Sequence, residues 1–213
     1  FIEFFAATGY VSEAELNHRG GWGLKKTADG KLAWQRSSEF YWNNMGEQEL
    51  SDHQPVGNIS RKDALAFCEW ATKTTGIKHR LPEEDEWEYA CRAGTQTAWS
   101  FGNDRENLDP HVWYAQNAQL LERAHGQIPG TKIISPWGLY DMHGNVWEWV
   151  QDWLGDYPGG VQTDPSGPAS GTARVFRGGS FKDVSEFSRS AQRCWNAPDL
   201  SFSNIGVRLL RVR

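Results

Sequence analysis

The residues best placed to bind a metal ion lie between positions 136 and 153 of this chain. Asp141 and Glu148 supply carboxylates there, and Gly144 and Val146 supply main-chain carbonyl groups between them. Ca²⁺ is a hard cation that takes several oxygen ligands, so these four residues form a candidate calcium site. The regular acidic spacing of an EF-hand is missing.

The same segment is also rich in tryptophan, which supports a structural alternative. It contains four of the twelve tryptophans in the chain: Trp137, Trp147, Trp149 and Trp153. Large aromatic side chains are usually buried, and each buried indole N–H needs a hydrogen-bond partner. The alternative to a cation site is therefore a buried aromatic hinge between two halves of the fold.

Cysteines and histidines offer little for redox chemistry. The three cysteines (Cys68, Cys91 and Cys194) are an odd number, and their spacing fits neither a zinc ribbon nor a CxxC redox pair. We expect Cys68 and Cys91 on apolar helix faces, where a free thiol behaves as a small hydrophobe. The six histidines are scattered, and hydrogen bonding is the expected role for each rather than metal ligation.

Length and composition indicate one folded α+β domain over residues 1–213. A chain of this length buries roughly 70% of the surface that it exposes when unfolded. The sequence contains no apolar run approaching the roughly 20 residues that span a bilayer, which argues against a membrane-spanning segment. Its net charge is −5 and no basic stripe interrupts the sequence, so we do not expect nucleic-acid binding.

Local patterns predict the elements that position these residues. Ser60 and Asp63 form a capping signal for a helix that ends at Gly76. A second helix is expected between Pro82 and Gly94, with acidic residues in its first turn where the helix dipole favours them. A helix at Phe1 that stops at Gly9 and short strands at 32–35, 173–179 and 205–212 complete the prediction. The stretch 18–54 is otherwise expected to be irregular.

Five motifs in order give the chain a resemblance that composition does not. They are DHQPVGNISRKDALAFCEWA, RLPEEDEWEYACRAGT, PWGLYDMHGNVWEW, RVFRGGSF and IGVRLL. Together they resemble the formylglycine-generating-enzyme (sulfatase-modifying-factor) family. The resemblance implies a variant of the C-type lectin fold with two helices, short strands and much irregular structure. It also implies that the family's opening strand is absent from this sequence.

The resemblance carries over the calcium site but not the catalytic site. The family's motif places calcium ligands at Asp141, Gly144, Val146 and Glu148. Its copper is held by two thiolates shortly after the RGGS motif, and thiolates are what Cu(I) prefers. No cysteine occurs between Ser180 and Arg193, so no copper is expected. The positions where the family has disulfide partners for Cys68 and Cys91 correspond to about Leu209 and Ser190, which are not cysteines.

The stretch from Phe181 to Ser203 resembles the variable region of proteins diversified by retroelements. Many of its residues are reachable from an asparagine codon by changing only adenines, whereas Lys182, Glu186 and Trp195 break that rule. We therefore treat residues 174–213 as a candidate variable region. The predicted ligand-binding residues are Phe181, Asp183, Val184, Ser185, Phe187, Ser188, Cys194, Trp195, Asn196, Ala197, Asp199, Leu200, Ser201, Phe202 and Ser203. The alternative is that they are ordinary loop residues.

These observations predict a non-catalytic binding protein that uses a diversified C-terminal surface. Aromatic residues among small polar ones are typical of adaptable binding surfaces. The expected partner is a macromolecule, and specifically a protein, met at the cell surface or outside the cell. The alternative function is an oxidoreductase of the same family that acts through a different metal or substrate site, with Cys194 as its candidate residue.

Overall fold

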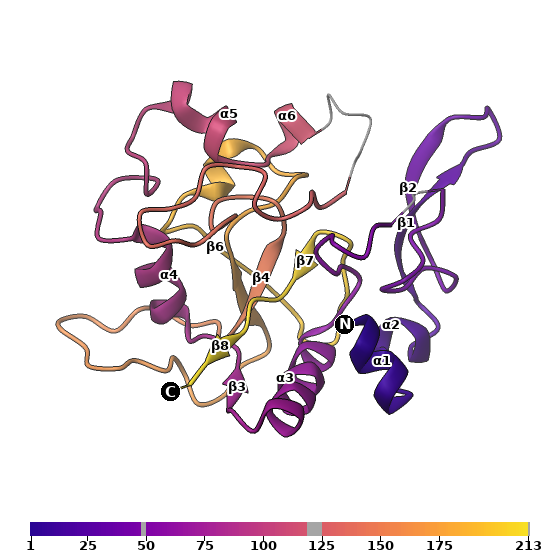
Figure 1. Ribbon diagram of the computed structural model, residues 1–213, viewed down its shortest axis with the longest axis horizontal. Coiled ribbons are helices and arrows are strands. Elements are labelled where there is room, and N and C mark those ends of the chain that lie inside the picture. Colours follow the sequence, from indigo (N-terminus) through magenta and orange to yellow (C-terminus); the bar gives the residue numbers. More distant parts are fainter. Residues whose placement is uncertain (48–49, 119–124, 213) are drawn as a thin grey trace.

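The computed structural model describes residues 1–47, 50–118 and 125–212. Within these ranges, short helices and strands are separated by long irregular stretches (Figure 1). The helices are α1 (Ile2–Thr8), α2 (Glu13–Leu16), α3 (Arg61–Thr75), α4 (Glu84–Arg92), α5 (Leu108–His111) and α6 (Ala115–Ala118), with 3-10 turns at Arg105–Asn107 and Ser185–Ser188. The strands are β1 (Gly21–Lys26), β2 (Leu32–Ser37), β3 (His79–Arg80), β4 (Trp147–Trp153), β5 (Arg174–Arg177), β6 (Arg193–Asn196), β7 (Ile205–Gly206) and β8 (Leu210–Arg211). The predicted α+β class is confirmed.

Helix α3 begins and ends where the sequence predicts. The Ser60 main-chain N–H donates to the Asp63 carboxylate at 2.7 Å, and the Asp63 N–H donates back to the Ser60 hydroxyl at 3.2 Å. This capping box satisfies donors that have no partner inside the helix. Gly76 ends the helix in a left-handed conformation with φ of 69°. Cys68 is buried on the inner face of α3, as expected.

Helix α4 also forms as predicted, but it ends one residue earlier. Ala93, and not Gly94, takes the left-handed capping position, with φ of 47°. Trp87 and Cys91 are buried on its inner face. Glu84 is also buried, and its carboxylate pairs with arginines of the C-terminal region. The acidic start of α4 therefore does more than complement the helix dipole.

A four-stranded sheet in the order β6-β5-β4-β7 forms the centre of the molecule. Strand β4 pairs antiparallel with β5, and β5 pairs antiparallel with β6. On its other side β4 pairs in parallel with β7. The predicted closing strand at 205–212 is divided: its first part is β7, and its last part, β8, leaves this sheet and pairs with β3 beside α3 (Figure 1).

The hairpin of β1 and β2 stands apart from the central sheet, next to α1 and α2 (Figure 1). Only β2 was predicted, because β1 contains Gly21 and Gly23, and glycine is uncommon inside strands. The structure explains both glycines. A Cβ atom at Gly21 would lie 2.5 Å from the Asn58 side chain, and one at Gly23 would lie 2.7 Å from the Phe40 ring. Strand β1 therefore needs glycine to pack closely against its neighbours.

The tryptophan-rich segment supplies the core of the central sheet. Trp147 and Trp149 are 3% and 0% exposed, and both rings contact Phe176 edge to face. Trp137 differs, because it is 45% exposed and its ring contacts Tyr89 at the surface. The expectation that this whole segment is buried is therefore wrong at its first tryptophan.

Candidate functional site

The C-terminal segment, residues 174–203, is a hairpin with a long connection, anchored to helix α4. Strands β5 and β6 place Arg177 opposite Arg193. Arg193 donates two hydrogen bonds to the Glu84 carboxylate, at 2.7 and 2.8 Å, and Arg177 lies 3.3 Å from the same carboxylate. Arg177 also pairs with Glu88. Because both strand ends are tied to one helix, the connection 178–192 has fixed ends.

Several predicted ligand-binding residues are exposed on this segment. Val184 is 57% exposed, Phe187 is 38% and Trp195 is 51%, and Asp199 is exposed as well. Trp195 lies on β6, which pairs with β5 alone and so forms an edge of the central sheet. The half-buried members of the predicted set are Asp183, Cys194, Asn196, Ala197, Leu200 and Phe202.

Five predicted contact residues are buried, so their assignment to an exposed surface is wrong: Phe181, Ser185, Ser188, Ser201 and Ser203. Phe181 packs with Ala118 and Val146 in a small core cluster. Ser188 accepts a hydrogen bond from the Trp99 indole at 3.0 Å, and Ser203 accepts one from Lys182 at 2.7 Å. The buried hydroxyl groups of Ser188 and Ser203 therefore satisfy polar groups of the framework.

Asp183 is oriented by the framework beneath it. Its Oδ2 atom accepts a hydrogen bond from the Trp147 indole at 2.8 Å and another from the Ser180 hydroxyl. Asn204 donates to that same hydroxyl at 2.9 Å. The carboxylate is therefore engaged in a polar network at the point where the sequence leaves the RGGS motif.

Sequence reasoning missed a cavity on this side of the molecule. It is a cavity of about 430 Å³ that is open to solvent and lies between the β1–β2 hairpin and the C-terminal region. The residues that line it are Trp22, Trp34, Phe181, Lys182, Phe202, Ser203 and Asn204. Lys182 is central to it, although the sequence marked this residue only as an exception to the codon rule. The signal that could have pointed to it is a lone lysine next to an aromatic residue in the candidate variable region.

Asp141, Gly144 and Val146 lie in the loop that leads into β4, whereas Glu148 is the second residue of β4 itself. Gly144 has φ of 89°, and a Cβ atom there would lie 2.2 Å from the Trp113 carbonyl oxygen. Asp141 is 9% exposed and also has a positive φ, of 56°. Its Oδ2 accepts from the Gly130 N–H at 3.0 Å, whereas Oδ1 is buried and accepts no hydrogen bond of normal geometry from the residues that the structure describes. Burial raises the pKa of this carboxyl, and the nearby Arg208 and Asn145 side chains lower it.

Glu148 is less available to a cation than Asp141. Arg208 donates to both Glu148 carboxylate oxygens, at 2.8 Å from Nη2 and 2.9 Å from Nε. The Trp87 indole donates to Oε2 at 2.7 Å. Among the described residues, no group of three or more histidine, cysteine, aspartate or glutamate side chains is arranged to hold a metal ion. The free Asp141 oxygen fits calcium, whereas the fully used Glu148 carboxylate does not.

All three cysteines are free thiols in environments that disfavour the thiolate. Burial raises the pKa of Cys68 to about 11 and that of Cys91 to about 12, and it also raises the pKa of Cys194. Leu209 packs against the core cluster that contains Cys68, and Ser190 lies close enough to Cys91 to influence its pKa. The positions that the family resemblance pairs with these two cysteines are therefore near them in space.

His143 is a buried polar side chain of the tryptophan-rich segment. Its Nδ1 lies 2.8 Å from the Ser188 carbonyl oxygen, and Nε2 lies 3.1 Å from the Ser100 main-chain nitrogen. The first contact needs a protonated Nδ1 and the second an unprotonated Nε2, so the ring is neutral. Burial lowers its pKa to about 4. Its contacts are structural, as expected for the histidines.

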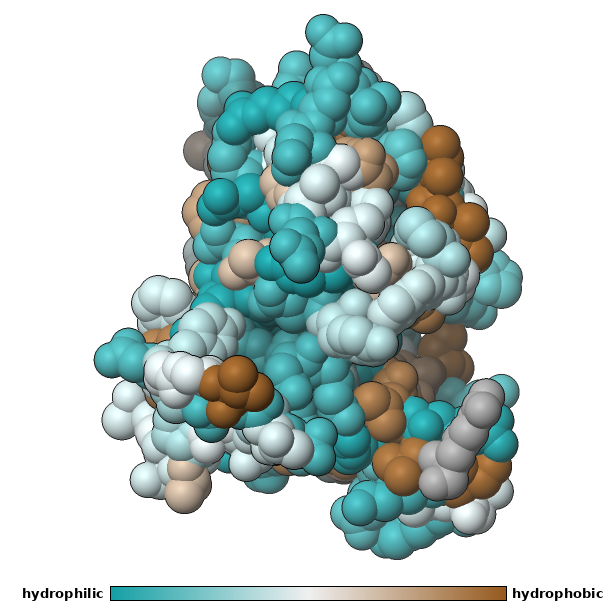
Figure 2. Space-filling view, turned by 90° about the vertical axis from the view of Figure 1, so that its left-hand side faces the viewer, coloured by the Kyte–Doolittle hydropathy of each residue, from teal (hydrophilic) through white to brown (hydrophobic). Residues whose placement is uncertain are grey.

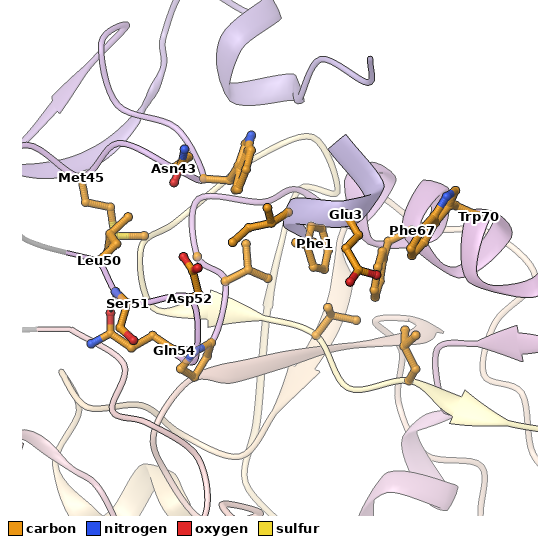
Figure 3. A pocket seen from close by; sticks show the side chains of 17 residues that line it. Phe1, Glu3, Asn43, Met45, Leu50, Ser51, Asp52, Gln54, Phe67 and Trp70 are labelled. Atoms are coloured by element: carbon orange, nitrogen blue, oxygen red, sulfur yellow. Dashed lines mark hydrogen bonds between the residues drawn. The ribbon is translucent and has the colours of Figure 1, made fainter. Parts of the chain in front are cut away.

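A larger groove of about 620 Å³ runs between α1, α3 and the chain before α3 (Figure 3). Phe1, Phe67 and Trp70 lie on one side of it, and Met45 and Leu50 lie on the other. None of the predicted site residues lines this groove.

The face on the left of Figure 1 is mostly hydrophilic, with hydrophobic side chains in a few separate places (Figure 2).

Comparison with known proteins agrees with this geometry. The model of the sulfatase-modifying factor enzyme 1-like domain matches residues 1–213. The chain belongs to this family. Members of the sulfatase-modifying factor family that it is similar to include the mouse formylglycine-generating enzyme, at 32% identity over 98% of this chain and 62% of that protein. The chain thus spans less than two thirds of that relative's length.

The chain is also similar to two further proteins. One is the mouse inactive Cα-formylglycine-generating enzyme 2, 31% identical over 98% of this chain and 70% of that protein. The other is a solved structure, Treponema denticola variable protein 1, with a TM-score of 0.70 and 28% identity over 77% of this chain and 73% of that chain. The C-type-lectin-like fold of the formylglycine-generating-enzyme type, expected from the motifs, is thereby confirmed.

No helix within the described ranges has both the length and the apolar composition needed to cross a membrane.

Proposed function

We propose that this chain is a non-catalytic binding protein whose C-terminal segment contacts a protein partner. The observation that carries the proposal is Trp195, a large aromatic side chain left 51% exposed on an edge strand of the central sheet. Exposed Trp side chains are costly in water and dominate protein interfaces when they are covered. Val184, Phe187 and Asp199 add apolar and charged contact groups on the same segment.

A binding surface of this kind benefits from a rigid support. Arg177 is fully buried and donates to the carbonyl oxygens of Ser190, Ala191 and Gln192, at 2.8 to 3.2 Å. These hydrogen bonds hold the returning part of the connection without using its exposed side chains. The segment therefore combines a fixed backbone with side chains that are free to vary, which reduces the entropy lost on binding.

The available thiols support a binding role over oxidation. Thiolates are the reactive form of cysteine and the ligands that Cu(I) prefers. The pKa of each of the three cysteines is raised by burial, and the chain between Ser180 and Arg193 contains no cysteine. Copper analysis of protein purified under copper loading tests this point. Stoichiometric copper bound by the chain would overturn the binding role and favour the oxidoreductase alternative.

Exchange of the exposed residues tests the proposal directly. A library that randomises Val184, Phe187, Trp195 and Asp199 should remain mostly folded and yield binders to a chosen protein target. A matched library at Ser185, Ser188, Ser201 and Ser203 should mostly lose the fold, because those side chains are buried. Protease resistance of the displayed chains measures folding. Equal loss of folding in both libraries, or a folded first library without binders, would contradict the proposal.

We also propose that the loop at Asp141 binds Ca²⁺. Support comes from the buried Asp141 Oδ1, which accepts no hydrogen bond of normal geometry from the described residues, and from the place of Gly144 and Val146 in the same loop, where their carbonyl groups are candidate ligands. The Glu148–Arg208 pair counts against Glu148 as a fourth ligand. Millimolar Ca²⁺ should raise the melting temperature of the wild type but not of Asp141→Asn. An identical melting temperature in Ca²⁺ and in EDTA would contradict the proposal.

A displayed binder meets its partner at the cell surface or outside the cell, and we propose that location for this protein. Fractionation of cells that produce the native protein measures it directly. Recovery in the soluble interior alone would contradict the proposed location.

A further inference from the structure

The cavity of about 430 Å³ between the β1–β2 hairpin and the C-terminal region has walls that are mostly aromatic. Trp22 and Trp34 come from the hairpin, and Phe181 and Phe202 come from the C-terminal region. Its volume falls within the range of about 300–1,000 Å³ that is typical of small-ligand sites. A cavity with such walls favours a flat or apolar ligand group.

Lys182 brings a positive charge into this aromatic surrounding. Its Nζ lies 3.3 Å from the centre of the Trp34 ring and donates one hydrogen bond to the Ser203 hydroxyl, at 2.7 Å. An ammonium group has three donors, so this hydrogen bond leaves capacity for an acceptor. The cation–π contact with Trp34 compensates only part of the charge.

No carboxylate of the described residues forms an ion pair with Lys182, although ion pairs are found for other lysines of the hairpin, such as Lys25 with Glu39. The adjacent Asp183 directs its Oδ2 to the Trp147 indole and the Ser180 hydroxyl instead. Burial lowers the pKa of Lys182 to about 8, and Asp183 offsets this only in part. A partly buried cation without a counter-ion is unfavourable, and an incoming anion would relieve that cost.

We propose that this cavity binds a carboxylate carried on an aromatic or apolar group, with the carboxylate at Lys182 and the apolar part between Trp22, Trp34 and Phe202. This inference rests on the proposed binding function and names the chemistry that one part of the surface recognises. A cationic ligand is disfavoured because the ammonium group would repel it. A neutral ligand would leave the charge of Lys182 uncompensated.

Such a carboxylate has two possible sources, a free small acid or the C-terminal carboxylate of a polypeptide. Two matched probe pairs separate them. Phenylacetate and phenylacetamide represent the free acid and its neutral analogue. N-acetyl-Gly-Phe with a free C-terminus and the same peptide amidated represent a chain end. Binding of each probe to the full chain is measured by calorimetry.

We expect at least one acid to bind at least tenfold more tightly than its amide. Lys182→Met should abolish that preference, Lys182→Arg should retain it, and the control Lys26→Met, on the same hairpin but exposed, should leave it unchanged. Because a bound carboxylate raises the Lys182 pKa, binding near pH 8 should take up protons from the buffer. Melting temperatures of the three variants confirm that each is folded.

Equal affinity for acids and amides, or no saturation by any of the four probes, would overturn the inference. An unchanged acid preference in folded Lys182→Met would do the same. None of these outcomes affects the library experiment at Val184, Phe187, Trp195 and Asp199, so failure of the carboxylate site is distinguishable from failure of the binding function.

Discussion

Strands β4 and β6 belong to the same sheet and both carry tryptophan, but their tryptophan side chains differ in solvent exposure. Trp149 on β4 is fully buried, and Trp195 on β6 is half exposed. The difference is position: β4 has a partner strand on each side, whereas β6 forms an edge. The polar groups around β4 are also paired internally, as Glu148 is with Arg208 and Trp87. Of the two edge strands, β6 exposes its tryptophan to solvent, whereas both residues of β7 are buried.

The strongest test of this contrast exchanges one tryptophan from each strand. Trp149→Ala should lower the free energy of unfolding by about 3–5 kcal/mol, because it leaves a large cavity in the core. Trp195→Ala should change it by about 0.5 kcal/mol or less, as for most surface positions. Denaturant unfolding of both variants measures the difference. Similar losses for the two would remove the distinction between the strands.

A smaller effect is expected at the anchor that joins the two regions. Arg177→Met should cost about 3 kcal/mol, since Glu88 keeps Arg92 but loses its buried partner, and three carbonyl groups lose their donor. The loss is at the low end of the range because Arg193 still pairs with Glu84. Arg189→Met is the control, since Arg189 is exposed on the same segment. A stable Arg177→Met protein would show that the C-terminal segment does not need this anchor.

The last test concerns the buried His143, whose expected effect is spread over a range of pH. Burial lowers the pKa of His143 to about 4, below its ordinary value of about 6.5, so the unfolded chain binds more protons between these pH values. The stabilisation that this group contributes is therefore fully present above pH 6.5 and is lost as pH falls toward 4. Over that window the free energy of unfolding falls by no more than about 1.4 kcal/mol per pH unit. His143→Gln should unfold with a shallower pH dependence in that window. Equal slopes for variant and wild type would contradict this assignment.

Sequence reasoning succeeded for elements whose signals are local. The capping box at Ser60, the glycine at 76 and the strand at 174–177 needed only neighbouring residues to be interpreted, and each lies where it was predicted. It missed β1, whose glycines are explained by contacts with Asn58 and Phe40 from elsewhere in the chain. The division of the closing strand into β7 and β8 likewise depends on partners distant in sequence.

The candidate surface was only partly predictable for the same reason. The codon pattern marked a continuous stretch of residues. Within that stretch, however, the local backbone conformation directs some side chains to solvent and others into the core. Ser185 and Ser188 turn inward on a 3-10 helix, while Phe187 between them remains partly exposed. The cavity at Lys182 was missed because half of its wall comes from the β1–β2 hairpin. Whether the loop at Asp141 binds calcium stays a prediction.

The direct pairing of Arg177 with Arg193 has an evolutionary consequence for the length of the chain between them. Both arginines are tied to α4, but the connection 178–192 also carries Phe181, Ser185 and Ser188, whose side chains are buried. The entropy of closing a loop grows only slowly with its length, by about 0.6 kcal/mol for each doubling. Homologues that keep the two arginines and Glu84 can therefore have a longer connection only where the added residues leave these buried side chains in place.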